Sequence, residues 1–338
     1  MNNIKKIGLS ALAGSLAMTS AQAVDYSISG DAIIKFASMD SPKSTEANNG
    51  KGIGVDTDLY FNASGELDNG FTVSFFQAAD TNGAWSNSSS QVTIGMGSMG
   101  TLQINNIAGA KANGIDDVMP AAYNETWDGL TLAANNPTFF GSSTASGSID
   151  YRIPAQEMMG ATINASVTFD PAADVGATAA GGVNATSISG TAYTLQIAHE
   201  SGLEIGGGLE SIDNATEGAT GSDEENVTVY AKFAMGPVTV GYQEAYQNAA
   251  NGGEDNEAEF MAIAYTAGDI SVSWGESSIT NHGTASSATQ VEREMDSIQV
   301  SYTMGAMTIA AAMGETSNSG GIAGQTHEES ELSVSFAF

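Results

Sequence analysis

The feature that most constrains this chain is a repeated alternation of apolar and polar residues in short segments. In residues 25–38, Ile34 and Phe36 share one face, while Asp31 and Lys35 lie on the other. This period of two predicts β-strands with one apolar face. Sixteen such segments are expected, covering residues 25–38, 53–67, 71–75, 92–96, 102–104, 149–153, 163–169, 193–197, 203–209, 227–233, 238–242, 261–265, 270–274, 298–302, 307–313 and 328–338.

The connections between these segments alternate strictly between eight long polar loops and seven short turns. In an up-and-down ring, this places all the long loops at one end and all the short turns at the other. That asymmetry and an even strand number are typical of transmembrane barrels, and only a closed sheet satisfies every backbone polar group in lipid. A ring of sixteen strands is wide enough for an aqueous channel. A soluble sandwich or extracellular β-repeat fold is the alternative, but it gives no reason for the loop asymmetry.

The charge of the chain restricts its partners. Nine basic residues stand against 39 acidic ones in a chain of 338 residues. A strongly acidic protein lacks the basic footprint that nucleic acids need, whereas it attracts cations. Cysteine is absent, which excludes disulfides, thiolate metal sites and a cysteine nucleophile.

The N-terminus has the three parts of a secretory signal peptide. Lys5 and Lys6 form a positive head, residues 7–17 an apolar core, and residues 21–23 (AQA) a small-residue cleavage site. We therefore predict that residues 1–23 are removed and that residues 24–338 form a single barrel domain. The remaining chain would carry seven basic residues and 39 acidic ones.

The alternation of apolar and polar residues stops in residues 107–147, which we call the long loop. A structureless loop of this length inside a compact fold is either functional or a sign of a wrong assignment. We predict that it folds into the hole of the ring. Its candidate pore residues are Asp116, Asp117, Glu125 and Asp128, and its candidate aromatic anchors are Tyr123, Trp127, Phe139 and Phe140.

Alternation also predicts which charged residues line the inside of the ring. A lysine or arginine facing lipid at the membrane midplane costs roughly 2–4 kcal/mol, so these residues are placed inside. Acidic wall residues outnumber basic ones, which favours cations in a channel. Each acidic loop residue could instead be an ordinary solvated charge, and each base a structural ion pair. The predicted wall residues are Asp31, Lys35, Asp56, Asp58, Tyr60, Asp150, Arg152, Lys232 and Arg293.

A run of three glycines interrupts one predicted strand at residues 206–208. Glycine inside a strand marks a close approach of another backbone or a locally weak strand. The approaching segment could be the long loop, and a merely flexible strand is the other interpretation.

The two ends of the predicted barrel resemble those of Gram-negative general porins. The last segment, SELSVSFAF, ends in Phe336 and Phe338, and the segment after the cleavage site reads VDYSISGDAIIKFAS. The resemblance is nearest to the short, acidic, glycine-rich porins of alphaproteobacteria. The proline-glutamate-phenylalanine loop signature of the enterobacterial branch is absent, so the detailed pore of that branch is not carried over.

This resemblance implies a 16-stranded antiparallel transmembrane β-barrel that assembles as a homotrimer, with one pore in each subunit. The third external loop folds inside and narrows the pore between acidic loop residues and basic wall residues, here Lys35, Arg152, Lys232 and Arg293. The terminal Phe338 and Phe336 would be read by the outer-membrane insertion machinery. Outer-membrane lipid and lipopolysaccharide would surround the barrel, and no cofactor is implied.

The expected function is a water-filled channel for passive diffusion of small hydrophilic solutes and ions, with a preference for cations. A substrate-specific channel is an alternative, for which Tyr60, Tyr123 and Trp127 could form an aromatic path. A non-conducting structural or adhesive surface barrel is another. Calcium could bind the acidic stretches at residues 213–225 and 254–259, although neither has the spacing of an EF-hand.

Catalysis is not expected. The three histidines, His199, His282 and His327, have no metal-ligand spacing. His199 near Ser201 is a poor base and nucleophile pair.

Overall fold

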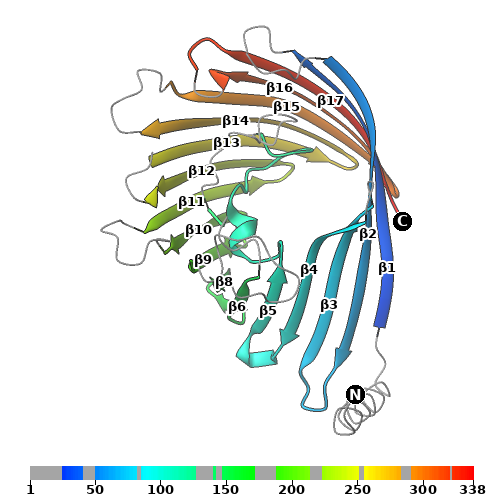
Figure 1. The fold of residues 1–338 in the computed structure, drawn as a ribbon, viewed down its shortest axis with the longest axis vertical. Helices are drawn as coiled ribbons and strands as arrows, with labels where there is room; N and C mark the ends of the chain where they lie inside the picture. Colours follow the sequence, from blue (N-terminus) through cyan, green and yellow to red (C-terminus); the bar gives the residue numbers. More distant parts are fainter. Residues whose placement is uncertain are drawn as a thin grey trace, which may run out of the picture.

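The structure, a computed structural model, is one antiparallel sheet curled into a ring (Figure 1). It describes residues 25–40, 50–81, 85–126, 140–141, 147–171, 188–213, 223–250, 255–282, 291–319 and 322–338. The strands are β1 (Asp25–Asp40), β2 (Gly50–Glu66), β3 (Thr72–Asp80), β4 (Ser86–Gly95), β5 (Thr101–Asn106), β6 (Ile149–Arg152), β7 (Gln156–Met158), β8 (Ala161–Asp170), β9 (Gly190–His199), β10 (Leu203–Ile212), β11 (Glu224–Met235), β12 (Val238–Asn248), β13 (Asp255–Ala267), β14 (Ile270–His282), β15 (Arg293–Met304), β16 (Met307–Ser317) and β17 (Thr326–Ala337). Two short 3-10 helices, η1 (Gly97–Met99) and η2 (Ala112–Ile115), complete the described elements.

The first and last strands pair with each other and close the sheet. Their register runs from Asp31 opposite Ala337 to Asp40 opposite Glu328. At the chain end, Gly30 N–H donates to the Phe338 carbonyl at 3.2 Å, and Phe338 N–H donates to the Gly30 carbonyl at 2.8 Å. Closure leaves no sheet edge to be satisfied in lipid.

Seventeen strand segments form sixteen barrel strands, because β6 and β7 both pair with β8. The break between them contains Pro154, which has no N–H to donate to the ladder. On either side the pairing continues, and Ile153 N–H still donates to the Ala165 carbonyl at 3.1 Å. The predicted fold class, a 16-stranded antiparallel barrel, is confirmed.

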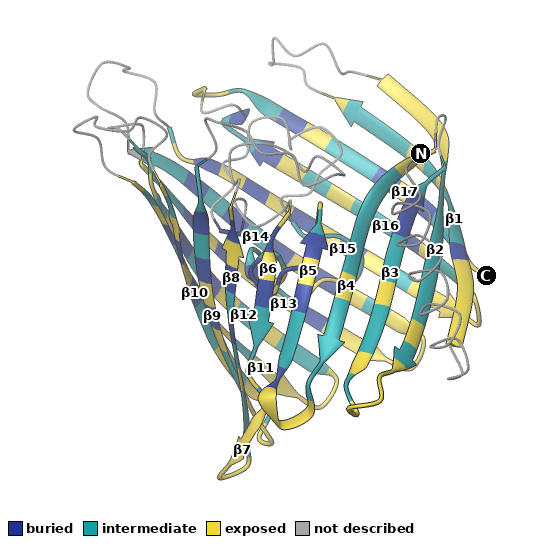
Figure 2. Ribbon diagram, turned by 60° about the horizontal axis from the view of Figure 1, so that its bottom comes forward, coloured by how far each residue is buried: buried dark blue, intermediate teal, exposed yellow. Residues whose placement is uncertain are grey.

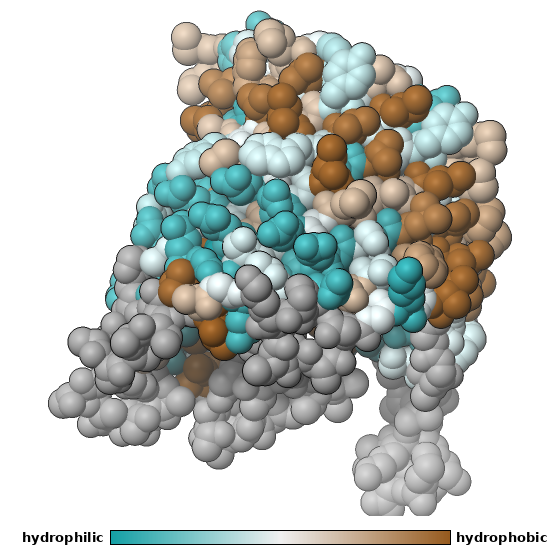
Figure 3. Space-filling model, turned by 90° about the horizontal axis from the view of Figure 1, so that it is seen from above, coloured by the Kyte–Doolittle hydropathy of each residue, from teal (hydrophilic) through white to brown (hydrophobic). Residues whose placement is uncertain are grey.

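Side chains alternate between the two faces of the ring. Unlike in a soluble protein, the apolar side chains face outward and many polar side chains face inward. On the outside, Ile298 is 55% exposed, and Figure 3 shows apolar side chains gathered on the side of the molecule. On the inside, polar side chains such as Gln243 and Thr228 are fully buried, and buried and exposed residues follow one another along the strands in Figure 2. Such a surface suits lipid rather than water.

The predicted alternation of eight long loops and seven short turns is confirmed by the strand bounds. The turn after β2 shows why the short connections are tight. Gly70 has φ +81°, a conformation that glycine adopts freely, and its N–H donates to the Leu67 carbonyl at 2.8 Å. Among the described residues, no helix is long and apolar enough to cross a membrane.

Several strands are longer than predicted. β3 continues beyond Phe75 to Asp80, because Asp80 still pairs with Asp58 of β2 although the apolar alternation has ended. The predicted signal peptide, residues 1–23, lies outside the described residues and remains a prediction.

Candidate functional site

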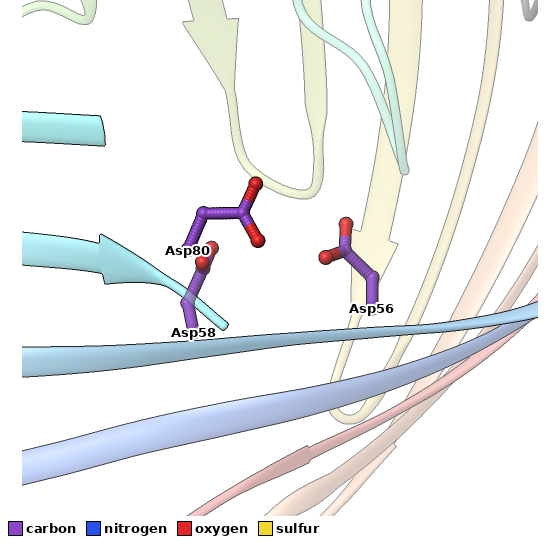
Figure 4. Close-up of side chains that lie close together, drawn as sticks. All are labelled: Asp56, Asp58 and Asp80. Atoms are coloured by element: carbon purple, nitrogen blue, oxygen red, sulfur yellow. The ribbon is translucent and has the colours of Figure 1, made fainter. Parts of the chain in front are cut away.

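Four aspartates lie together on the inner face of β1, β2 and β3. Asp31 is opposite Asp58, and Asp58 is opposite Asp80 in the strand register. The carboxylates of Asp56, Asp58 and Asp80 offer oxygen atoms that all lie within 4.8 Å of one another, and Figure 4 shows the three side chains around one space. We call Asp31, Asp56, Asp58 and Asp80 the acidic wall patch. Carboxylate oxygens are ligands that hard cations prefer.

Tyr60 belongs to the same wall. Its hydroxyl donates to Asp31 Oδ2 at 2.6 Å, and its ring stacks on Phe76 with centroids 6.1 Å apart. The sequence predicted Asp31, Asp56, Asp58 and Tyr60 on the inside but missed Asp80. Continuing the alternation of β3 past Phe75 would have found it, because residues 76, 78 and 80 all face inward.

The four basic wall residues lie on four separate strands and do not form a cluster. Three of them form an ion pair with a carboxylate of the wall, as the alternative interpretation of these bases expected. Lys35 Nζ lies 3.6 Å from Glu331, Arg152 Nε 2.6 Å from Asp150, and Lys232 Nζ 3.3 Å from Glu204. The fourth, Arg293, is only 5% exposed. Lys35, Arg152 and Lys232 are therefore each compensated by a neighbouring carboxylate.

Asp150 has two hydrogen-bond partners in the wall. It accepts a hydrogen bond from Thr168 Oγ1 at 2.7 Å in addition to the Arg152 contact. Arg152 Nη2 also donates to the Gly109 carbonyl of the long loop at 3.0 Å. The Arg152–Asp150 pair therefore fixes the beginning of the long loop against the wall.

The long loop is hydrogen-bonded to the inner faces of strands that are distant in sequence. Its backbone N–H groups donate to wall side chains on β12, β14 and β15, and the Tyr123 hydroxyl donates to Glu331 on β17. In Figure 1 the described part of the loop crosses the space within the ring. The backbone contacts are Val118 N–H to Gln243 Oε1 at 3.0 Å, Ala122 N–H to Ser273 Oγ at 2.8 Å, and Tyr123 and Asn124 N–H to Gln299 Oε1 at 2.9 and 3.0 Å.

Apolar contacts hold the same loop. Phe140 is 1% exposed and belongs to a buried cluster. The cluster consists of Ala112, Ile115, Phe140, Ala192 and Tyr230, with Val118 and Met119 packed against it. These apolar contacts join the loop to Ala192 of β9 and Tyr230 of β11.

The predicted loop residues are placed as follows. Asp116 accepts a hydrogen bond from Gln243 Nε2 through its backbone carbonyl at 2.8 Å. Asp117 is 7% exposed, and its Oδ1 accepts the Met119 N–H at 2.8 Å. Glu125 is partly buried. Trp127, Asp128 and Phe139 lie outside the described residues.

A polar cavity of about 350 Å³ lies where the long loop leaves β5. Its lining is mostly amide and cationic side chains, so the space beside the loop suits water. The lining includes Gln91, Gln103, Lys111, Arg152 and Gln196.

Tyr123 is expected to ionise unusually late. Burial, together with its hydrogen bond to Glu331, raises the pKa of Tyr123 to about 12. The folded state therefore favours the neutral phenol, and this stabilisation is fully present below the unfolded pKa of about 10 and is lost as pH rises through about 12. In an ultraviolet pH titration, the difference between the parent protein and Tyr123→Phe should show one tyrosinate step near pH 12. A step near pH 10 would contradict the buried hydrogen bond.

The chain matches the model of a known protein family over nearly its whole length. A family model described as Gram-negative porin matches residues 8–338. The chain belongs to the Gram-negative porin family. This porin therefore forms a channel in the outer membrane with transmembrane strands, and its family and fold indicate a channel rather than an enzyme. A comparison with curated proteins found no match.

Solved structures with the same fold include several porins. The anion-selective porin from Comamonas acidovorans has 11% identity and a TM-score of 0.65, covering 94% of this chain and 100% of that one. A loop L8 deletion mutant of OmpT, an outer membrane protein of Vibrio cholerae, has 12% identity and a TM-score of 0.63 with the same coverage. The trimer form of OmpT has 11% identity, the same coverage and a TM-score of 0.61. At these identities the likeness shows the fold alone.

Proposed function

We propose that this porin is a general diffusion channel with a preference for cations. The observation that carries the proposal is the acidic wall patch. Three of its carboxylates lie within 4.8 Å of one another, whereas Lys35, Arg152 and Lys232 each pair with another carboxylate. Concentrated negative charge in a confined passage raises the local cation concentration.

The hydrogen bonds of the long loop support a constriction. They run along β12, β14, β15 and β17, so we propose that the passage lies between the loop and the wall formed by β1 to β3. Among the predicted loop carboxylates, Asp116 and Glu125 would line its loop side and the acidic wall patch its other side. Both sides would then repel anions.

A homotrimer is the proposed assembly, because a similar fold is recorded as a trimer form of Vibrio cholerae OmpT. Residues 1–23 remain the proposed signal peptide that directs export.

Passive diffusion is tested by the swelling of liposomes that contain the purified porin. Uncharged sugars of increasing size should enter at rates that fall smoothly with size and do not saturate with concentration. Saturable entry of one sugar, or its block of the others, would favour a substrate-specific channel. Liposomes that do not swell at all would favour a structural barrel.

A further inference from the structure

Three inward-facing glycines lie beneath the long loop on β10, β12 and β14. A Cβ at any of them would lie less than 3.0 Å from an atom of the loop. At Gly241 the nearest atom is Cδ of the rigid Pro120 ring, so a side chain there would displace the loop, whereas at Gly208 and Gly275 a side chain would displace the Phe140 ring and the Thr126 hydroxyl of the loop. The loop residues involved are Phe140 above Gly208, Met119 and Pro120 above Gly241, and Thr126 above Gly275. We call Gly208, Gly241 and Gly275 the seat glycines.

Each seat glycine has a polar companion two residues away on the same strand. Residues separated by two share a face of a strand, so glycine and companion point at the loop together. Each companion accepts a backbone N–H of the loop close to the residue that covers its glycine. The pairs are Gly208 with Glu210, which accepts Gly141 N–H at 3.0 Å; Gly241 with Gln243, which accepts Val118 N–H at 3.0 Å; and Gly275 with Ser273, which accepts Ala122 N–H at 2.8 Å.

The glycine and its polar companion have different roles in placing the loop. The missing side chain lets the loop approach the wall, and the companion's hydrogen bond fixes its position along the strand. Gln243 also donates to the carbonyls of Ile115 and Asp116, at 3.0 and 2.8 Å. Glu210 is 3% exposed and Gln243 is fully buried, and losing a buried hydrogen-bond partner is expensive. At three places, the glycine therefore sets how closely the loop approaches the wall, and the hydrogen bond sets its position along the strand.

We infer that the seat glycines are positioning residues that set the width of the channel. This rests on the proposed function, in which the long loop narrows the passage. An added methyl group at Gly241 would lie 2.8 Å from Pro120 Cδ, whereas non-bonded carbon atoms prefer roughly 3.5–4.0 Å. The loop must then move away from its wall and into the passage.

The test combines channel recordings with a direct probe of the loop position. Gly208→Ala and Gly241→Ala should each lower the single-channel conductance by roughly a third, because a narrower constriction passes less current. Gly54→Ala is the matched control, since Gly54 of β2 faces inward like the seat glycines and an added Cβ there meets nothing within 4 Å. It should conduct like the parent protein.

The loop position is measured by oxidative cross-linking of an Ala122→Cys/Ser273→Cys pair. The pair should cross-link efficiently in the parent background and several-fold less in the Gly241→Ala background. Unchanged cross-linking together with unchanged conductance would overturn the inference. Lost cross-linking with unchanged conductance would confirm that the seat glycines position the loop. It would also show that the loop does not limit the current, so the proposed constriction would fail separately.

Discussion

Replacing Asp56, Asp58 and Asp80 together by asparagine is expected to lower the cation-to-anion permeability ratio by roughly threefold, because local charge concentrates counterions in a confined passage. These three carboxylates lie within 4.8 Å of one another on the inner wall. Asparagine keeps the size and shape of each side chain, so the barrel should retain its stability. The measurement is the zero-current potential of each protein in a salt gradient.

A matched control removes three carboxylates from the outside of the same barrel. Glu276, Asp296 and Glu315 are direct cross-strand neighbours on β14, β15 and β16, and they share a face with exposed Ile298 and Met313. Their amide variants change the net charge equally but should leave the permeability ratio unchanged. Equal effects of the two triple variants would show that net charge, and not the wall patch, determines selectivity.

Ile298→Arg is expected to destabilise the folded barrel by about 2–4 kcal/mol in lipid, because arginine at the midplane of the outer face meets hydrocarbon. Ile298 is 55% exposed in the middle of β15. Denaturant unfolding in phospholipid vesicles measures the free energy of unfolding directly. A change below about 1 kcal/mol would place this face away from lipid.

Ser301→Arg provides the comparison on the same strand. Ser301 lies three residues after Ile298 on the same strand, so its side chain faces the inside of the ring rather than lipid. Its free energy of unfolding should stay within about 1 kcal/mol of the parent value. Two equal losses would argue that β15 tolerates no arginine on either face, whatever the surrounding solvent.

Most of the fold could be predicted from the sequence because its signals are local. Alternation fixes the face of each residue, and turn residues such as Gly70 fix the hairpins. The inward placement of Lys35, Arg152 and Lys232 followed from the same alternation of residues between the two faces of a strand. Strand ends were less predictable, and β3 was cut short where apolar residues gave way to polar ones.

The contacts of the long loop could not be predicted, since they join residues far apart in sequence. Gln243 and Ser273 carry no local sign that they accept loop N–H groups. The glycine run at residues 206–208 correctly marked a close approach, but the covering group at Gly208 is the Phe140 ring rather than a backbone. Gly241 and Gly275 are isolated glycines without such a signal.

The partners of the basic residues also could not be predicted from the local sequence pattern. Lys232 pairs with Glu204, its cross-strand neighbour in the β10–β11 hairpin, so a known register would have revealed it. Lys35 pairs with Glu331 across the seam between the first and last strands. That contact exists only because the sheet closes.

The most direct test of a cation-preferring channel is a planar bilayer recording of the purified porin with a salt gradient across the membrane. We predict large ohmic current steps and a zero-current potential of the sign that cation flow produces. Steps in groups of three would agree with a homotrimer. A zero-current potential of the opposite sign, as anion selectivity would give, would contradict the role assigned to the acidic wall patch.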